Sequence, residues 1–223
     1  MEDDILQELI AATLRLRDDP LWLSLLTENL IWASCEGFVQ SSVLGAFNLA
    51  SQHYVAARES VLRWGASKVQ PDLSLFRPAA YSDWRNSTPF GRPQMVTGVA
   101  QLTLVWTEGN AAGSAVVSQK APKIARDADG LSRFAAAHPG RSAYVGVLTS
   151  GAHEPDEGRA ALDSAAALIR EHLAAQTISV EHEERIDLLA NRLLDHWVGW
   201  SRHSSAVGIW VEMCWFRIAA RSA

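Results

Sequence analysis

The stretch MVTGVAQLTLVWT, residues 95–107, decides the fold class, because it is rich in β-branched and apolar residues and predicts a strand. The nearby segment SAVVSQ (114–119) has the same character, and the glycine-containing turn between them, Glu108 to Gly113, predicts a hairpin. Farther along, SAYVGVLTSG (142–151) is a nearly continuous apolar run, which is typical of a buried strand. The centre of the chain therefore predicts a β-sheet.

Weaker strand signals lie on both sides of this centre. The segment YVAARESVLRW (54–64) alternates loosely, and PDLSLF (71–76) alternates with a period of two. Prolines and a glycine in residues 77–94 predict an irregular loop. Residues 206–218, AVGIWVEMCWFRI, predict a last strand, with a short buried helix as the alternative.

Helices are predicted before and after the sheet, from apolar side chains at helical spacing. They span residues 3–17, about 21–35, 37–53, 127–138, about 155–175 and about 180–200. We expect one α/β domain over residues 1–223, with a small mixed β-sheet flanked by helices. Its expected parts are a helical N-terminal part (1–53), an αβ core (54–151) and a helical C-terminal part with a final strand (152–223).

The composition predicts a soluble cytoplasmic protein. The acidic N-terminus lacks the basic start of a signal peptide, and no run of 18 apolar residues predicts a membrane span. The two cysteines, Cys35 and Cys214, have neither CxxC nor zinc-ligand spacing, and free thiols suit a reducing compartment.

The net charge of −5 conceals a basic middle. Residues 53–145 carry 11 basic and 6 acidic groups, whereas residues 1–52 have a net charge of −6 and residues 146–223 a net charge of −4. A basic region between acidic flanks is expected to bind phosphate groups, and scattered solvated arginines are the equally simple alternative. From this region we select Arg77, Arg85, Arg92 and Lys123 as candidate nucleic-acid-binding residues.

Four segments in order resemble the core of the PD-(D/E)xK nuclease superfamily. They are PDLSLF (71–76), AVVSQKAP (115–122), DADGLSRF (127–134) and SAYVGVLTSG (142–151). In that family a helix, three strands, a helix and a strand follow one another. The resemblance covers roughly residues 54–151 and implies a restriction-endonuclease-like core with helical additions at both ends.

The resemblance implies a catalytic site with Asp72 as the PD aspartate and Lys120 as the terminal lysine. In such a site two carboxylates bind Mg²⁺, the metal activates a water molecule, and the lysine stabilises developing negative charge. The residue two positions before Lys120 is Ser118, where the family has Asp or Glu. A serine hydroxyl is a poor substitute for an anionic metal ligand.

Other carboxylates offer a replacement for the missing acid. Glu108, at the predicted turn, is the first candidate for a metal ligand together with Asp72, and Glu28 or Glu36 from the preceding helices is the alternative. Each of these acids is more simply explained as an ordinary surface residue.

Two functions follow from these observations. The first is a nuclease-like nucleic-acid-binding protein that is a catalytically impaired Mg²⁺-dependent DNA nuclease. The second is a non-catalytic interaction or adaptor subunit with the same fold, which uses a tryptophan-rich C-terminus to bind a protein partner or a second copy of itself. Neither function calls for a membrane.

Overall fold

The computed structural model describes residues 4–32, 36–58, 61–85, 93–108, 112–154, 156–193 and 208–221. The helices are α1 (Asp4–Arg17), α2 (Pro20–Trp32), α3 (Glu36–Ala50), α4 (Pro78–Arg85), α5 (Ala112–Ala137) and α6 (Gly158–Ala175), with a short 3₁₀ helix η1 (Pro93–Met95). The strands are β1 (Val55–Arg58), β2 (Leu62–Trp64), β3 (Ser67–Val69), β4 (Leu73–Phe76), β5 (Gly98–Glu108), β6 (Ser142–His153), β7 (Val180–Leu193) and β8 (Gly208–Ile218).

A six-stranded mixed sheet forms the centre of the molecule, with the strand order β1-β4-β5-β6-β8-β7. Strands β5 and β6 are parallel, and the other neighbouring pairs are antiparallel. Strands β2 and β3 form a separate two-stranded hairpin. The prediction of a small mixed sheet flanked by helices is confirmed.

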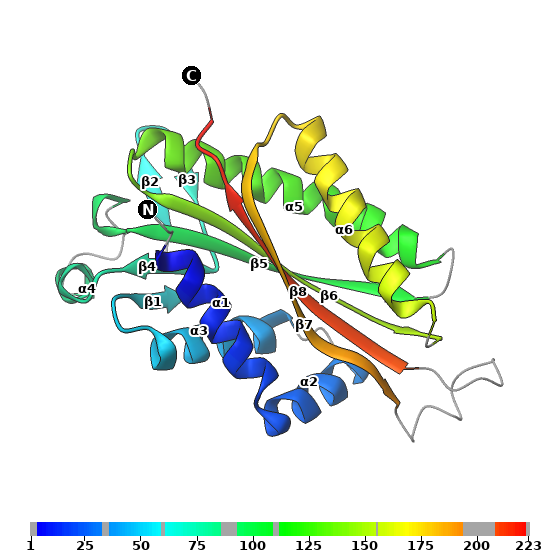
Figure 1. Cartoon of the computed structure of the whole chain (residues 1–223). Helices are drawn as coiled ribbons and strands as arrows, with labels where there is room; N and C mark the ends of the chain where they lie inside the picture. The colour runs from blue at the N-terminus through cyan, green and yellow to red at the C-terminus, as the bar shows by residue number, and fades with distance from the viewer. Residues whose placement is uncertain are drawn as a thin grey trace.

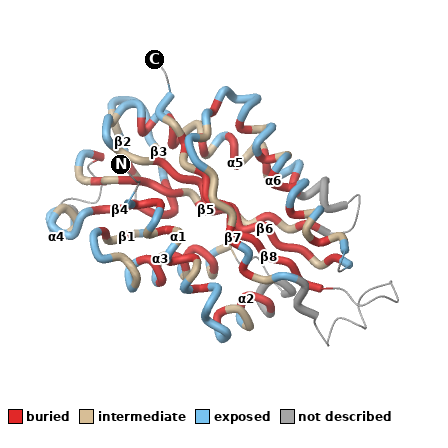
Figure 2. Tube along the Cα trace, viewed as in Figure 1, coloured by how far each residue is buried: buried red, intermediate tan, exposed pale blue. Residues whose placement is uncertain are grey.

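Helices cover both faces of the sheet (Figure 1). On one face, α1, α2 and α3 pack against a core that includes Leu102, Met213 and Trp215. On the other face, α5 and α6 pack against a core that includes Val147 and Phe216. The central strands are buried from both sides (Figure 2), which explains why residues 142–151 lack polar alternation.

A helix, three strands of the main sheet, a helix and a strand follow one another at the centre of the chain, although the strand and the helix predicted at residues 114–119 and 127–138 are one helix, α5. Helix α3 is followed by β1, β4 and β5, then by α5 and β6, and these four strands are neighbours in the sheet. The hairpin of β2 and β3 is inserted between the first and second strands of this series.

Within the described ranges, no helix has the length and apolarity to span a bilayer.

The strand predicted at residues 114–119 is wrong, because these residues belong to helix α5. Buried side chains recur at helical spacing from Val117 through Ala121 and Ile124, and the same stripe continues along the helix. The short run of β-branched residues at 116–117 favoured a strand, although the helical spacing is clear over a longer stretch. Pro122 also argued against a helix, but it lies inside α5. Consequently β5 leads into α5 rather than into a hairpin partner.

The helix predicted at residues 180–200 is also wrong, because β7 occupies residues 180–193 and residues 194–200 lie outside the described ranges. Ile186 and Leu188 are buried against the α1 side, while charged residues alternate with them on the α6 side. The C-terminal part therefore has one helix and two strands that widen the sheet, rather than two helices and one strand. Residues 77–94, predicted as an irregular loop, contain α4 and η1.

Candidate functional site

Asp72 lies immediately before β4, where that strand's pairing with β5 ends. Leu73 pairs with Ala100, and β5 continues beyond this point to Glu108. The Asp72 carboxylate accepts a hydrogen bond of 2.6 Å from the backbone N–H of Leu102. This side chain therefore replaces the backbone partner that β4 no longer provides to β5 at this position. Asp72 is only 8% exposed. The bond fixes the carboxylate at the junction of the two strands.

Asp72 is one of five charged residues that come together from three elements. We call this group the Asp72 cluster: it contains Glu36 at the start of α3, Asp72 before β4, and Lys120, Lys123 and Asp127 on α5. The Glu36 carboxylate lies 3.9 Å from the Lys120 ammonium and 4.0 Å from that of Lys123. Lys123 lies 3.6 Å from Asp127. Charges on Glu36, Lys123 and Asp127 all act on Asp72.

Burial raises the pKa of Asp72 to about 6. The Leu102 N–H opposes this shift by stabilising the charged form, whereas the neighbouring carboxylates Glu36 and Asp127 raise the pKa further. Burial also raises the pKa of Asp127, and Lys123 opposes that shift. The charged forms of the buried carboxylates in this cluster are therefore disfavoured. Such shifts are typical both of functional sites and of buried ion networks.

Two side chains of β5 face the same side of the sheet as Asp72. Val99 and Val105 pack on the α5 side, and strand alternation puts Gln101 and Thr103 on that side too. By the register of Leu73 with Ala100, Gln101 lies beside Asp72. Gln101 and Thr103 thus occupy two positions with the spacing that the nuclease resemblance assigns to an acid and a lysine.

The hydroxyl of Thr103 is buried and has no hydrogen-bond partner among the described residues. An amide and a hydroxyl therefore stand on the strand where a carboxylate and an ammonium were expected. Neither residue was predicted from the sequence, because the strand that carries the acid and the lysine of the motif was placed at residues 114–119 instead of at β5. The only available signal was the spacing Gln101-x-Thr103 in the strand predicted at residues 95–107, and it carries no charge.

The two predicted catalytic partners of Asp72 have different outcomes. Lys120 lies in the Asp72 cluster, but on helix α5 rather than on a strand. Glu108 is six residues beyond Leu102 on β5, which is about 20 Å along the strand. The prediction that Glu108 approaches Asp72 is therefore wrong. Glu36, named as an alternative acid, lies near Asp72, and the side chain of Glu28 lies outside the described residues.

The predicted nucleic-acid-binding residues do not form one group. Lys123 belongs to the Asp72 cluster. Arg77 and Arg85 are exposed at the start of α4 and at its end, and Arg77 is separated from Asp72 by the whole of β4, about 16 Å. Arg92 lies outside the described residues.

The cluster does not provide the two-carboxylate strand site that a nuclease metal needs. In the described part of the chain, no group of three or more His, Cys, Asp or Glu side chains is arranged to hold a metal ion. Glu36 is engaged by both lysines, Asp72 accepts the Leu102 N–H, and Gln101 provides a neutral oxygen. The Mg²⁺ site stays a prediction for experiment.

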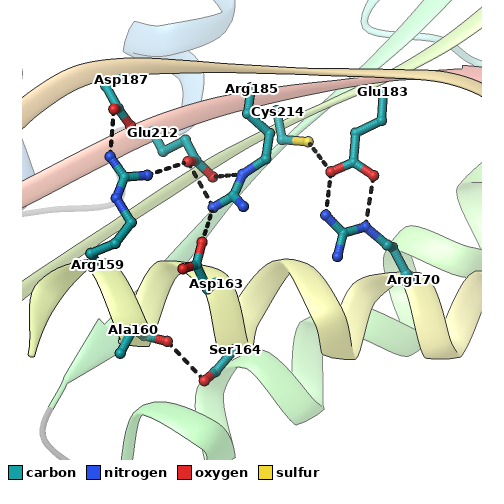
Figure 3. Close-up of polar contacts among 10 residues, drawn as sticks. All are labelled: Arg159, Ala160, Asp163, Ser164, Arg170, Glu183, Arg185, Asp187, Glu212 and Cys214. Carbon is teal, nitrogen blue, oxygen red and sulfur yellow. Dashed lines mark hydrogen bonds and ion pairs between the residues drawn. The ribbon is translucent and has the colours of Figure 1, made fainter.

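A second charged network joins α6 to β7 and β8 (Figure 3). Glu212, 1% exposed, accepts hydrogen bonds of 3.0 Å from both Arg159 and Arg185. Arg185 also donates to Asp163, and Arg159 pairs with Asp187. Arg170 makes a bidentate pair with Glu183 in the same layer, and this hydrogen bonding lowers the Glu183 pKa. Because its charges compensate one another, this network is best explained as the attachment of α6 to the sheet.

The tryptophans of the C-terminal strand do not form the expected partner surface. Trp215 is fully buried, and its indole N–H donates a hydrogen bond of 2.9 Å to Thr13 of α1. Trp210 is 9% exposed and packs against Gly158 at the start of α6. Trp197 and Trp200 lie outside the described residues.

Comparison with known proteins leaves the relationship to the nuclease superfamily unassigned. No protein-family model matches the chain, and no significant match was found among curated proteins or solved structures. The functional argument therefore depends on the geometry of the Asp72 cluster and its surroundings.

The raised pKa of Asp72 predicts a specific dependence of stability on pH. Between about pH 4 and pH 6 the folded protein binds a proton at Asp72 more readily than the unfolded chain does, so this residue's contribution to the free energy of unfolding falls as pH rises. Asp72→Asn removes the titration, and its stability relative to the wild type should increase by on the order of 1 kcal/mol from pH 4.5 to pH 8.

Urea unfolding of both proteins across this pH range measures the difference. Asp83→Asn, which changes an exposed acid on α4, is the matched control and should give the same difference at every pH. A stability difference for Asp72→Asn that does not vary with pH would show that Asp72 titrates normally.

Proposed function

We propose that this protein binds nucleic acid on a nuclease-like core and does not cleave it. The observation that carries the proposal is the grouping of Asp72 with Lys123 and Glu36, where Glu36 also lies near Lys120. The adjacent strand offers Gln101 and Thr103 in place of an acid and a lysine. The order of the core elements supports the same reading. A site of this kind has cations for phosphate contact, and its two strands provide one carboxylate, Asp72, instead of the two expected to bind Mg²⁺.

The two lysines are available for phosphate contact. Their ammonium groups lie 3.9 and 4.0 Å from Glu36, and that of Lys123 also lies 3.6 Å from Asp127. The side chains of Lys120 and Lys123 are still 40% and 41% exposed. An ammonium group has three donors, so each can bind a phosphate oxygen while it stays near Glu36. The binding expected from such contacts is electrostatic and independent of sequence.

The loss of a strand carboxylate argues against efficient cleavage. A metal held by Asp72 and an amide oxygen would lose one anionic ligand, and the metal is what lowers the pKa of the attacking water. Lys120 approaches from the helix and cannot supply that missing negative charge. Binding without cleavage is the function that these residues support best.

A protein-interaction function is the second candidate, and a different surface favours it. Leu21 and Leu25 are 68% and 40% exposed and stand one turn apart on α2, so they form an apolar strip. This strip, rather than Trp210 and Trp215, is where a protein partner would bind under this reading.

The first test combines binding and cleavage by the wild-type protein. Labelled single-stranded and duplex DNA and RNA should bind, with an affinity that falls on the order of a hundredfold from 50 to 200 mM KCl as counterions are released. The same substrates should stay intact with Mg²⁺ or Mn²⁺. Cleavage that disappears in Asp72→Ala would show an active nuclease, and absence of binding at low salt would leave the protein-interaction function.

A second test rebuilds the missing acid. Gln101→Glu places a carboxylate beside Asp72, so Mn²⁺ should raise the melting temperature of this variant by several degrees and leave that of the wild type unchanged. The control is Ser118→Glu, which adds the same charge at an exposed position of α5. Adding Asp72→Ala to Gln101→Glu should abolish the Mn²⁺ effect.

An equal response of the Gln101 and Ser118 variants would mean that added charge, and not a metal site beside Asp72, explains the shift. No response from Gln101→Glu would contradict the placement of this residue in the acid position.

A further inference from the structure

The hairpin inserted between β1 and β4 places two cations directly opposite each other. Arg63 of β2 and Lys68 of β3 are register partners, and both are exposed. Side chains in such a pair start about 5 Å apart, so the hairpin presents two cationic side chains close together. We call the β2–β3 hairpin with these residues the basic hairpin.

Packing holds the basic hairpin on α5 in a defined position. Leu62 is fully buried, and the Trp64 ring lies edge-on to Phe134 with their centroids 5.6 Å apart. Val69 lies against Gly130, where an added Cβ would be 3.8 Å from it. The two cations therefore stand on an ordered platform.

The basic hairpin is a direct neighbour of the Asp72 cluster. Lys68 precedes Asp72 by four residues, which limits their separation to about 14 Å. Along α5, the cluster residue Lys123 is followed two turns later by Gly130, which contacts β3. The distance along the helix from Lys120 to the hairpin contact at Phe134 is about 21 Å.

The distribution of lysine in the chain matches this arrangement. The chain has three lysines, Lys68, Lys120 and Lys123, and the hairpin and the cluster contain all of them. The large apolar residues that are exposed in the described part of the chain lie on α2 and α3 instead, on the other face of the sheet. Phosphate chains need cations without apolar anchors, whereas protein interfaces depend on apolar and aromatic anchors.

We propose that Arg63, Lys68, Lys120 and Lys123 form one basic track that binds the sugar-phosphate backbone of nucleic acid along α5. This inference rests on the proposed function and adds the basic hairpin as the element that extends the binding surface beyond the Asp72 cluster. A track of about 20 Å matches roughly six phosphates of one strand at their axial spacing in a duplex.

The test measures binding of labelled 20-nucleotide DNA by fluorescence anisotropy at several KCl concentrations. The variant Arg63→Gln/Lys68→Gln should bind at least tenfold more weakly at 100 mM KCl, and the slope of log affinity against log salt should decrease by between one and two. The control variant Arg15→Gln/Arg17→Gln removes the same charge from exposed positions of α1, on the other face, and should bind like the wild type. The melting temperature of the hairpin variant, measured alongside, should stay close to that of the wild type, because both replaced side chains are exposed and the packed residues Leu62 and Trp64 are unchanged.

The outcomes separate this inference from the function on which it rests. Wild-type binding that the hairpin variant retains in full would overturn the basic track and leave nucleic-acid binding in place. Absence of wild-type binding would overturn both. Equal binding of poly-glutamate, with the same loss in the hairpin variant, would assign the track to acidic peptides and overturn the proposal for nucleic acid.

Discussion

The hydrogen bond from the Leu102 N–H to the Asp72 carboxylate is the contact on which the candidate site depends. It ends the β4–β5 ladder with a side chain, so β5 can continue past β4 without an unsatisfied donor at this position. It also holds a carboxylate in a buried place between α3 and α5, where the charges of Glu36 and Lys123 reach it. Without this bond, burial of Asp72 would be costly and uncompensated.

The sequence predicted the long buried strands better than it predicted the segments next to them. Long apolar patterns such as residues 95–107 and 142–151 were assigned correctly, because burial on both faces leaves one simple signal. The start of α5 was misassigned because a short run of β-branched residues favoured a strand. Strand β7 was misassigned because its leucines lie close to helical spacing, although its charged residues alternate. In both cases tertiary packing decided the structure.

The candidate site was predictable only in part. Asp72 and Lys120 were named from the resemblance to the nuclease motif, and the structure puts both near Glu36. Gln101 and Thr103 could not be found, because neutral side chains on a strand give no chemical signal until the register of β4 and β5 is known. The basic hairpin was hidden for a similar reason: Arg63 and Lys68 become a pair only when the strands fold against each other.

The most direct measurement of the central claim is lysine footprinting during nucleic-acid binding, because the chain's three lysines all lie on the proposed surface. An amine-reactive ester, applied with and without a 20-nucleotide DNA and read by mass spectrometry, reports each lysine separately. We predict that the DNA protects Lys68, Lys120 and Lys123 together, that a mononucleotide at the same concentration does not, and that the DNA is recovered at full length with Mg²⁺ present. Unchanged reactivity of all three lysines while the DNA is bound would contradict the account.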